Sequence, residues 1–299
     1  MALKLGDPSH LLNPNYKTDI TRWLAEDCPS FDYGGFVVGD DPEAAKLLGK
    51  SNGILAGVPF FNEVFRQLDC TVEWHLAEGS SITAPPSSHV ATVRGPVRNL
   101  LLGERVALNI LARCSGIATK SARLRAKIDA AFPNGRAPIL AGTRKTTPGF
   151  RLVEKYGMLI GGCDPHRYDL SAMTMLKDNH IWACNGSITR AVHAAKAVGG
   201  FAIKVEVECQ SYEEAEEAIE AGADVVMLDN FDGPRVKTCS EKLRGKFGSG
   251  RFLIEVSGGV TEENIGSYLV AGGGSVDVIS TSSIHQGVGH VDFSLKIVL

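Results

Sequence analysis

A chain of 299 residues with 44% hydrophobic residues can bury one large core or two modest ones, and its formal net charge of −3 excludes a generally basic protein that binds nucleic acid or anionic membranes. The seven cysteines are odd in number, scattered and without a C-x-x-C pair, which argues against a disulfide framework or a structural zinc site. No signal peptide and no apolar run of about 18 residues is recognised, so we expect a cytoplasmic protein, with the nucleus as the alternative location.

The first part of the chain, to about residue 115, predicts an α+β module. Apolar spacing of i, i+3 and i+4 predicts short helices near 20–24 and 61–68. Alternation of polar and apolar residues predicts strands over 71–76 and 89–94. Two more helices are expected at 101–113 and 116–132, ended by the Pro-Asn-Gly sequence at 133–135. We therefore place a domain boundary between residues 1–115 and 116–299.

The rest of the chain alternates short apolar runs with amphipathic helices, which predicts a parallel sheet. Ser211 and Glu214 form a capping box, and Gly222 follows the helix expected over 212–221. Six expected strands are two fewer than an eightfold barrel has, so an incomplete α/β barrel competes with an open doubly wound sheet. No G-x-G-x-x-G opens a helix, which disfavours a dinucleotide site. The strands are expected at 138–142, 172–176, 201–207, 224–228, 252–256 and 276–279.

Polar or charged residues follow nearly all of these strands. One such ending is more often a solvated loop, but the carboxyl ends of parallel barrel strands form one rim, where barrels carry their catalytic groups. Six successive endings therefore predict a shared site. They are Thr143-Arg144-Lys145, Lys177-Asp178-Asn179-His180, Glu206-Val207-Glu208, Asp229-Asn230, Ser257-Gly258-Gly259 and Ser280-Thr281-Ser282.

Carboxylates gather on two of the expected strands. Because strand side chains alternate, Lys204, Glu206 and Glu208 share one face, and a structural salt-bridge network is the alternative interpretation. Asp229 adds a carboxylate from the next strand. Glu208 and Asp229 suit Mg²⁺, which prefers oxygen ligands and retains waters beside phosphates. These two residues are the predicted magnesium ligands, directly or through water.

Phosphate binding is predicted at Ser257-Gly258-Gly259, which follows a strand and is expected to open a helix, although a plain tight turn explains the glycines as well. Arginine suits planar carboxylates, whereas lysine supplies a point charge for phosphate or leaving-group oxygens. His166 in isolation is as well explained as a loop histidine, and Arg105 as a surface ion pair. The basic candidates are Arg144, Lys145, Arg151, Arg167 and Lys177, with Arg105 from the first domain.

The chain resembles the quinolinate phosphoribosyltransferase family nearly from end to end, on seven ordered motifs. The resemblance implies an N-terminal α/β sandwich followed by an irregular, incomplete α/β barrel, with C-terminal residues packing back on the first domain. It also implies a homodimer in which Arg105 reaches the neighbouring subunit's site, and hexamer-type assemblies of such dimers. The motifs are Leu102-Gly103-Glu104-Arg105-Val106-Ala107-Leu108-Asn109, Ala141-Gly142-Thr143-Arg144-Lys145-Thr146-Thr147-Pro148-Gly149, His166-Arg167-Tyr168-Asp169-Leu170, Lys177-Asp178-Asn179-His180, Glu206-Val207-Glu208, Leu228-Asp229-Asn230 and Ser257-Gly258-Gly259.

The family's activity is the transfer of phosphoribosyl from phosphoribosyl pyrophosphate to quinolinate with decarboxylation. The products are nicotinate mononucleotide, pyrophosphate and CO₂, in de novo NAD biosynthesis, and the cofactor is Mg²⁺. The implied quinolinate residues are Arg105, Thr143, Arg144, His166, Arg167 and Lys177. The implied phosphoribosyl pyrophosphate residues are Lys145, Glu208, Asp229, Ser257, Gly258 and Gly259, and the implied catalytic residues are Lys145, Lys177, Glu208 and Asp229.

The chain departs from the family at its last strand end. The family often has glycine at Ser282 and a Thr-His-Ser continuation, whereas this chain continues Ile284-His285-Gln286, so contacts of residues 280–286 are not assigned. Three alternatives to the family's activity stay open. They are a phosphoribosyltransferase that uses nicotinate, a Schiff-base aldolase that uses Lys177 or Lys204, and a non-catalytic anion-binding barrel.

Overall fold

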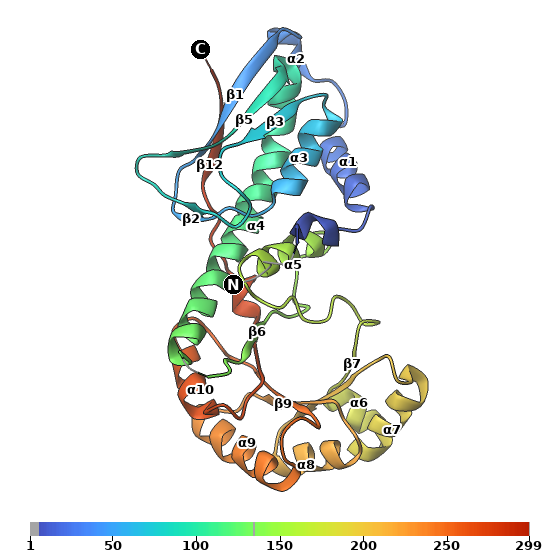
Figure 1. The fold of residues 1–299 in the computed structure, drawn as a ribbon. Coiled ribbons are helices and arrows are strands. Elements are labelled where there is room, and N and C mark those ends of the chain that lie inside the picture. The colour runs from blue at the N-terminus through green and yellow to red at the C-terminus, as the bar shows by residue number, and fades with distance from the viewer. Residues whose placement is uncertain (1–5, 134, 299) are drawn as a thin grey trace. The chain divides into compact units, whose positions relative to one another are not determined.

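The computed structural model describes residues 6–133 and 135–298, which divide into two compact units (Figure 1). Unit 1 draws on residues 1–122, 146–162 and 287–299, and unit 2 on residues 123–145 and 163–286. Each unit is therefore assembled from segments that are separate in the sequence. The predicted boundary near residue 115 falls inside helix α4 (Val97–Ala131).

Unit 1 is built on a four-stranded antiparallel sheet in the order β12-β1-β5-β3. The last strand, β12, pairs with the first, β1, where Ala45 faces Ile297, so segments far apart in the sequence share one sheet. The strands are β1 (Pro42–Gly49), β3 (Thr71–Trp74), β5 (Ser88–Pro96) and β12 (Phe293–Ile297), and β2 (Gly53–Ile54) pairs separately with β4 (Ser81–Ile82).

The core of unit 1 is an apolar cluster centred on one helix. Phe60, Phe61 and Phe65 are fully or almost fully buried because the apolar face of α3 carries them at helical spacing. Tyr156 of α5 packs edge-on against Phe60, with ring centroids 5.4 Å apart. The helices are η1 (Pro8–Leu11), α1 (Tyr16–Asp27), α2 (Tyr33–Val38), α3 (Val58–Gln67), α5 (Arg151–Ile160) and the first part of α4.

The expectation of two helices at 101–113 and 116–132 is wrong, because α4 runs through the expected break as one helix of 35 residues. The small residues at the break serve close packing. Ser115 is fully buried, accepts the N–H of Ala56 at 3.0 Å and donates to its carbonyl at 3.1 Å. A Cβ at Gly116 would lie 2.2 Å from the carbonyl oxygen of Gly289. Tertiary contacts therefore override the local helix-breaking signal.

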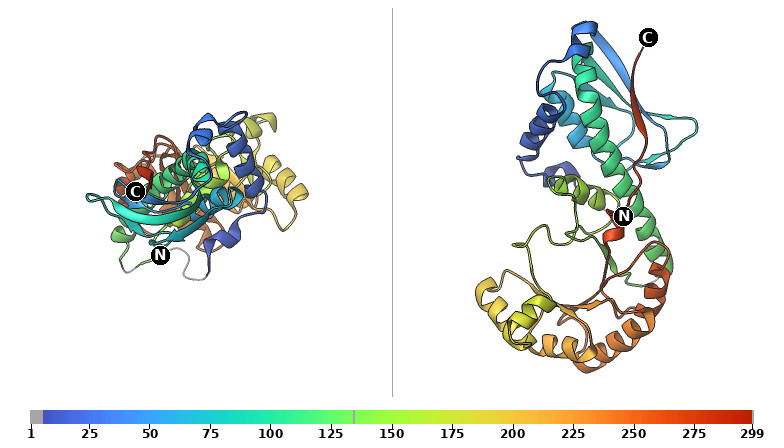
Figure 2. Two further views of the ribbon diagram at one scale, coloured as in Figure 1. Left: turned by 90° about the horizontal axis from the view of Figure 1, so that it is seen from above. Right: turned by 180° about the vertical axis from the view of Figure 1, so that it is seen from behind.

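Unit 2 is an open parallel sheet of six strands in the order β6-β11-β10-β9-β8-β7, with β6 and β7 as the outer strands. Figures 1 and 2 show α7, α8, α9 and α10 along one side of this curved sheet. The predicted fold class, a sheet domain followed by an incomplete α/β barrel, is confirmed. The strands are β6 (Ile139–Ala141), β7 (Thr174–Leu176), β8 (Val205–Cys209), β9 (Val225–Asp229), β10 (Leu253–Ser257) and β11 (Val278–Ser280).

The helices of unit 2 alternate with these strands. They are α6 (Asp178–Ala183), α7 (Ile188–Gly199), α8 (Tyr212–Glu220), α9 (Gly233–Phe247), α10 (Ile265–Gly272) and η2 (Ser282–Ile284), with the end of α4. Half of the predicted capping box of α8 is present, since Ser211 accepts the N–H of Glu214 at 3.1 Å. The Glu214 carboxylate accepts the N–H of Gln210 at 2.7 Å instead of that of Ser211.

Two local expectations in unit 2 are wrong. Lys204 is exposed and precedes β8, so it does not share the buried face of Glu206 and Glu208. Gly259 does not open a helix, because α10 begins at Ile265 after an intervening turn. The phosphate prediction at these glycines must therefore rest on loop amides instead of a helix end.

Among the described residues, the structure contains no helix with both the length and the apolar character that a membrane crossing requires.

Candidate active site

A cavity of about 320 Å³ lies in unit 2 at the carboxyl ends of the six strands. The cavity is lined by pairs of residues that are separated by one position in the sequence, because such side chains share a face of the sheet. Met175 and Lys177, Met227 and Asp229, and Glu255 and Ser257 form such pairs. A larger open hollow of about 850 Å³ on unit 1 is lined by none of the predicted site residues.

The basic run that follows β6 enters the cavity wall. Lys145 donates its backbone N–H to the Thr143 hydroxyl at 3.1 Å, so the run turns tightly around Thr143. The same hydroxyl lies 3.1 Å from Nε2 of the buried His285, and the amide of Gln286 donates to the Lys145 carbonyl at 3.4 Å. The loop after β11 therefore holds the basic run in place, although its residues 284–286 depart from the family's pattern.

A second pair of basic residues comes from the segment between α5 and β7. His166 has a positive φ of 58°, and its own N–H donates to Asp164 at 2.6 Å. Arg167 donates its backbone N–H to Nδ1 of His166 at 2.7 Å and its guanidinium to the Met173 carbonyl at 3.4 Å. Burial and then the nearby charge of Arg144 lower the pKa of Arg167. Two guanidinium groups crowded in one cavity are best compensated by an anion.

One lysine and two carboxylates lie at the carboxyl ends of β7, β8 and β9. The Lys177 ammonium, at the end of β7, pairs with Glu208 of β8, and 42% of the lysine side chain but 15% of the glutamate side chain is exposed. Asp229 accepts hydrogen bonds from Gln210 at 3.1 Å and from Asn230 at 2.7 Å. Its side chain is thereby fixed at the rim by neutral donors.

The loop after β10 gives the cavity a backbone wall. Gly258 and Gly259 have φ of 92° and 65°, values that favour glycine. A Cβ at Gly258 would lie 2.3 Å from Oδ1 of Asn230, so this position also requires the missing side chain. Asn230 and Ser257 are joined by a backbone hydrogen bond of 2.9 Å. The loop can therefore bring backbone N–H groups close to an anion.

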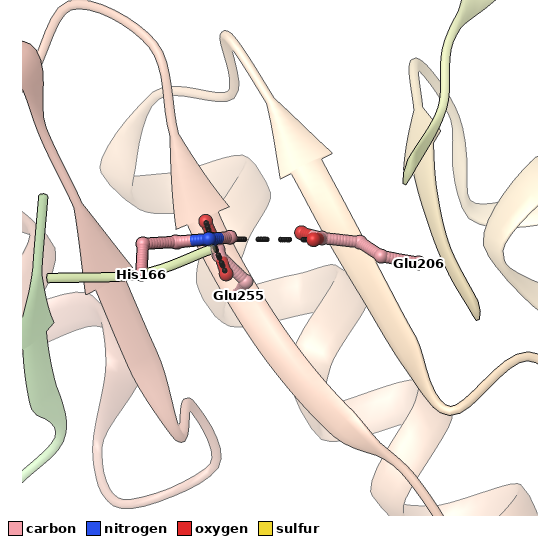
Figure 3. A group of neighbouring side chains, drawn as sticks. All are labelled: His166, Glu206 and Glu255. Carbon is pink, nitrogen blue, oxygen red and sulfur yellow. Dashed lines mark hydrogen bonds and ion pairs between the residues drawn. The ribbon is translucent and has the colours of Figure 1, made fainter. Parts of the chain in front are cut away.

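The floor of the site contains a buried group that the sequence analysis did not assign. In Figure 3 the ring of His166 overlaps the carboxylate of Glu255 and points toward that of Glu206, and its Nε2 lies 3.2 Å from Glu255 and 4.0 Å from Glu206. Glu206 is fully buried, and neither of its carboxylate oxygens has a hydrogen-bond partner among the described residues. Burial, and then the charge of Glu255, raise the pKa of Glu206 well above its usual range.

Comparison with known proteins decides the family. The model of the quinolinate phosphoribosyl transferase N-terminal domain matches residues 30–115, and the model of its C-terminal domain matches residues 117–296. This chain belongs to the quinolinate phosphoribosyl transferase family.

Relatives and solved structures agree with the family models. The carboxylating nicotinate-nucleotide pyrophosphorylase of Dictyostelium discoideum is 49% identical over 298 residues, covering 96% of this chain and 97% of the relative. The human protein of the same name is 50% identical over 278 residues, covering 93% and 90%. The structure of the nicotinate-nucleotide pyrophosphorylase from Francisella tularensis superposes with a TM-score of 0.86 at 32% identity, covering 96% of this chain and 98% of that chain.

Nearly all the site residues that the family resemblance implied line this same cavity in unit 2. Arg105 is the exception: it is an exposed residue of α4 in unit 1 and is not part of the lining. Glu255, Met175 and Met227 also line the cavity and were not predicted, whereas Asn230 and Ser280 belong to strand endings that were predicted to share the site. The residues brought together as predicted are Thr143, Arg144, Lys145, His166, Arg167, Lys177, Glu208, Asp229, Ser257, Gly258 and Gly259.

Two carboxylates of the cavity, Glu208 and Asp229, are the candidate ligands for Mg²⁺. Glu208 and Asp229 both reach the cavity, but neither belongs to a group of three or more metal-ligand side chains in the described part of the chain. Mg²⁺ commonly binds through one or two carboxylates, together with waters and substrate phosphates. The two carboxylates fit a magnesium ion that arrives with a phosphorylated substrate, and they are too few for a site made of protein ligands alone.

Proposed function

We propose that this chain transfers the phosphoribosyl group of phosphoribosyl pyrophosphate to quinolinate, with loss of CO₂, and so makes nicotinate mononucleotide for NAD biosynthesis. The observation that carries the proposal is that one cavity collects two sets of groups. Its guanidinium and imidazole groups are here called the basic wall, and its carboxylates, Lys145 and glycine loop are called the opposite wall. Membership of the family supports the same reaction.

The basic wall suits a small ring with two carboxylates. Arg144 and Arg167 offer flat pairs of donors, which match carboxylates better than a lysine does. At an effective dielectric constant of ~20, a cation about 4 Å away contributes about 4 kcal/mol of attraction before desolvation, so several cations are needed. We assign quinolinate to Thr143, Arg144, His166, Arg167 and Lys177.

The opposite wall suits the sugar phosphate. Ser257, Gly258 and Gly259 present backbone N–H groups for the phosphate, and Lys145 supplies charge for the departing pyrophosphate. Glu208 and Asp229 are the proposed holders of Mg²⁺ and of the ribose hydroxyls. The metal, when bound with the substrate, neutralises the pyrophosphate oxygens.

The reaction asks little of the protein in acid or base catalysis. The pyridine nitrogen attacks the ribose carbon with its own lone pair, so no general base is required. The side chains of Glu208 and Asp229 stabilise positive charge that develops on the sugar, and Lys145 and Lys177 stabilise the leaving group. Once ribosylated, the ring is a pyridinium and accepts the electron pair released when the adjacent carboxylate leaves as CO₂. A proton from water then takes the place of the lost carboxylate on that ring carbon.

We further propose a homodimer in which Arg105 of each subunit completes the quinolinate wall of the other, with hexamer-type assemblies of such dimers. Arg105 is exposed on α4 and is outside the cavity lining of its own chain. Exposure of Phe36 by 89% and Val37 by 81% on α2 supports an association surface on the same unit. We expect the protein in the cytoplasm, with the nucleus as the alternative.

The test compares two substrates with the purified chain. In the presence of Mg²⁺ and without ATP, the protein should release pyrophosphate from phosphoribosyl pyrophosphate when quinolinate is added. It should release far less when nicotinate is added instead. Preference for nicotinate would contradict the proposal and favour the nicotinate enzyme. Binding of both substrates without turnover would favour the non-catalytic barrel. Borohydride trapping of a carbonyl substrate on Lys177 or exposed Lys204 would favour the aldolase.

A further inference from the structure

A continuous row of hydrogen-bonded side chains links His166 of the basic wall to Ser257 of the glycine loop. Nε2 of His166 lies 3.2 Å and 3.3 Å from the two carboxylate oxygens of Glu255. The Ser280 hydroxyl donates to Glu255 at 2.5 Å and lies 2.9 Å from the Ser257 hydroxyl. Glu255 therefore connects the histidine of the quinolinate wall with the serine of the phosphate loop.

The direction of each hydrogen bond follows from the available protons. Nδ1 of His166 accepts the N–H of Arg167 at 2.7 Å, so the proton of the neutral ring lies on Nε2 and is donated to Glu255. A hydroxyl has one proton, and that of Ser280 goes to Glu255, so Ser257 must donate to Ser280. Both branches of the row thus end on Glu255 as the acceptor.

Among the described residues, no second acceptor lies within hydrogen-bond distance of Nε2 of His166. Glu255 is 2% exposed, and its two oxygens are occupied by His166 and Ser280. Glu206 is 4.0 Å from Nε2 of His166, beyond hydrogen-bond distance. The orientation of His166 therefore depends on two hydrogen bonds, from the Arg167 N–H to Nδ1 and from Nε2 to Glu255.

We propose that Glu255 is a positioning residue that holds His166 toward quinolinate and, through Ser280, holds Ser257 toward the phosphoribosyl group. The binding of both substrates then depends on one buried carboxylate. This inference rests on the proposed function, because that function assigns the two walls to the two substrates.

A metal site is the alternative for the same residues, since His166, Glu206 and Glu255 offer three ligand atoms within 4.8 Å of one another. The hydrogen bonds disfavour it. A histidine ligand needs a free lone pair, whereas Nδ1 of His166 accepts a backbone N–H and Nε2 carries the proton.

The test is Glu255→Gln, with Ser280→Ala as the matched control. Glutamine has one acceptor oxygen, and its NH₂ group would face one of the two donors. We expect the KM of quinolinate and the KM of phosphoribosyl pyrophosphate each to rise about tenfold, the effect of losing a charge-assisted hydrogen bond. Ser280→Ala should raise the KM of phosphoribosyl pyrophosphate alone. In the Glu255→Gln background, Ser280→Ala should add little, because the row is already broken.

A structural role predicts a different result: kcat would fall with the fraction of folded protein, and neither KM would change. Nitrogen NMR of the histidine rings gives a second readout, since His166 should carry its proton on Nε2 and its signals should move in Glu255→Gln. Unchanged KM values with unchanged ring signals would overturn the inference. So would a stoichiometric metal ion that wild-type protein holds and Glu255→Gln loses. If wild-type protein does not turn over quinolinate, the proposed function fails instead.

Discussion

The ammonium of Lys177, at the end of β7, pairs with the carboxylate of Glu208 on the neighbouring strand β8. The pair joins a residue assigned to quinolinate with one assigned to the phosphoribosyl side. Lys177→Ala should lower kcat/KM by about hundredfold, or about 3 kcal/mol, because it removes a cation from the site and leaves Glu208 without its partner. Steady-state kinetics with either substrate varied would measure this loss. Glu208→Gln should act mainly on kcat, and equal effects of both variants on KM alone would contradict this assignment.

Arg144→Ala should weaken quinolinate binding far more than it lowers thermal stability. Loss of one partner of a desolvated charge pair costs about 3 kcal/mol, roughly hundredfold in affinity. The control is Arg136→Ala, whose side chain is 80% exposed and lies 3.7 Å from Asp277. Calorimetric titration with quinolinate and a melting curve of each variant make the comparison. Wild-type turnover by Arg144→Ala would rule out its role.

Gly258→Ala should raise the KM of phosphoribosyl pyrophosphate, because the new methyl group would collide with Asn230 and displace the loop. Gly250→Ala is a close control: φ is 93° at Gly250 and 92° at Gly258, but a Cβ at Gly250 meets nothing within 4 Å. Both variants carry the same backbone strain, about 1 kcal/mol. An equal KM in the two variants would show that the glycine loop does not contact this substrate.

The Arg105→Ala variant should be inactive alone. Its activity should be restored by a second variant that keeps Arg105 but lacks a residue of its own cavity. Mixing Arg105→Ala with Lys145→Ala chains and reassociating them yields heterodimers with one complete site. Random reassociation predicts about a quarter of wild-type activity, since half of the dimers are mixed and only one of the two sites in each mixed dimer is complete. Activity of Arg105→Ala close to wild type, or no recovery after verified subunit exchange, would contradict donation across the interface.

Stability should depend on pH through Glu78 of unit 1. Burial raises the pKa of Glu78 from 4.5 to about 7, even though its carboxylate accepts the N–H groups of Gly57 and Val58. The folded state therefore binds this proton more tightly than the unfolded state, and the free energy of unfolding should fall as pH rises from about 4.5 through 7. Urea midpoints across pH 5 to 8 would measure this fall.

Glu78→Gln should flatten that dependence. Glu73→Gln is the control, because Arg94 lowers the pKa of Glu73 and its contribution is lost only at more acidic pH. A slope that persists in Glu78→Gln would assign the pH dependence to another group.

Much of the site could be predicted because a parallel sheet brings its strand ends together. Lys177, Asp229 and Ser257 were found from their positions after apolar runs, without any knowledge of pairing order. The pairing of β1 with β12 depends on contacts between opposite ends of the chain, which no local pattern reveals. The single helix α4 was missed because Ser115 and Gly116 look like a break but serve packing.

Glu255 was missed because it lies within an apolar run that reads as a buried strand. A usable signal existed: it is two residues before Ser257 and therefore shares its face. Arg105 cannot be assigned by geometry within one chain, since its proposed role needs a second subunit. Lys204 was misplaced because the strand was expected to begin four residues before β8 does.

The most direct test of the proposed reaction is the fate of the carboxylate next to the ring nitrogen. Quinolinate labelled with ¹³C in that carboxylate is incubated with the protein, phosphoribosyl pyrophosphate and Mg²⁺, and CO₂, pyrophosphate and nucleotide are measured together. The proposed reaction predicts one labelled CO₂ and one unlabelled nicotinate mononucleotide for each pyrophosphate released. Pyrophosphate release with the label retained in the nucleotide, or no release at all, would contradict it.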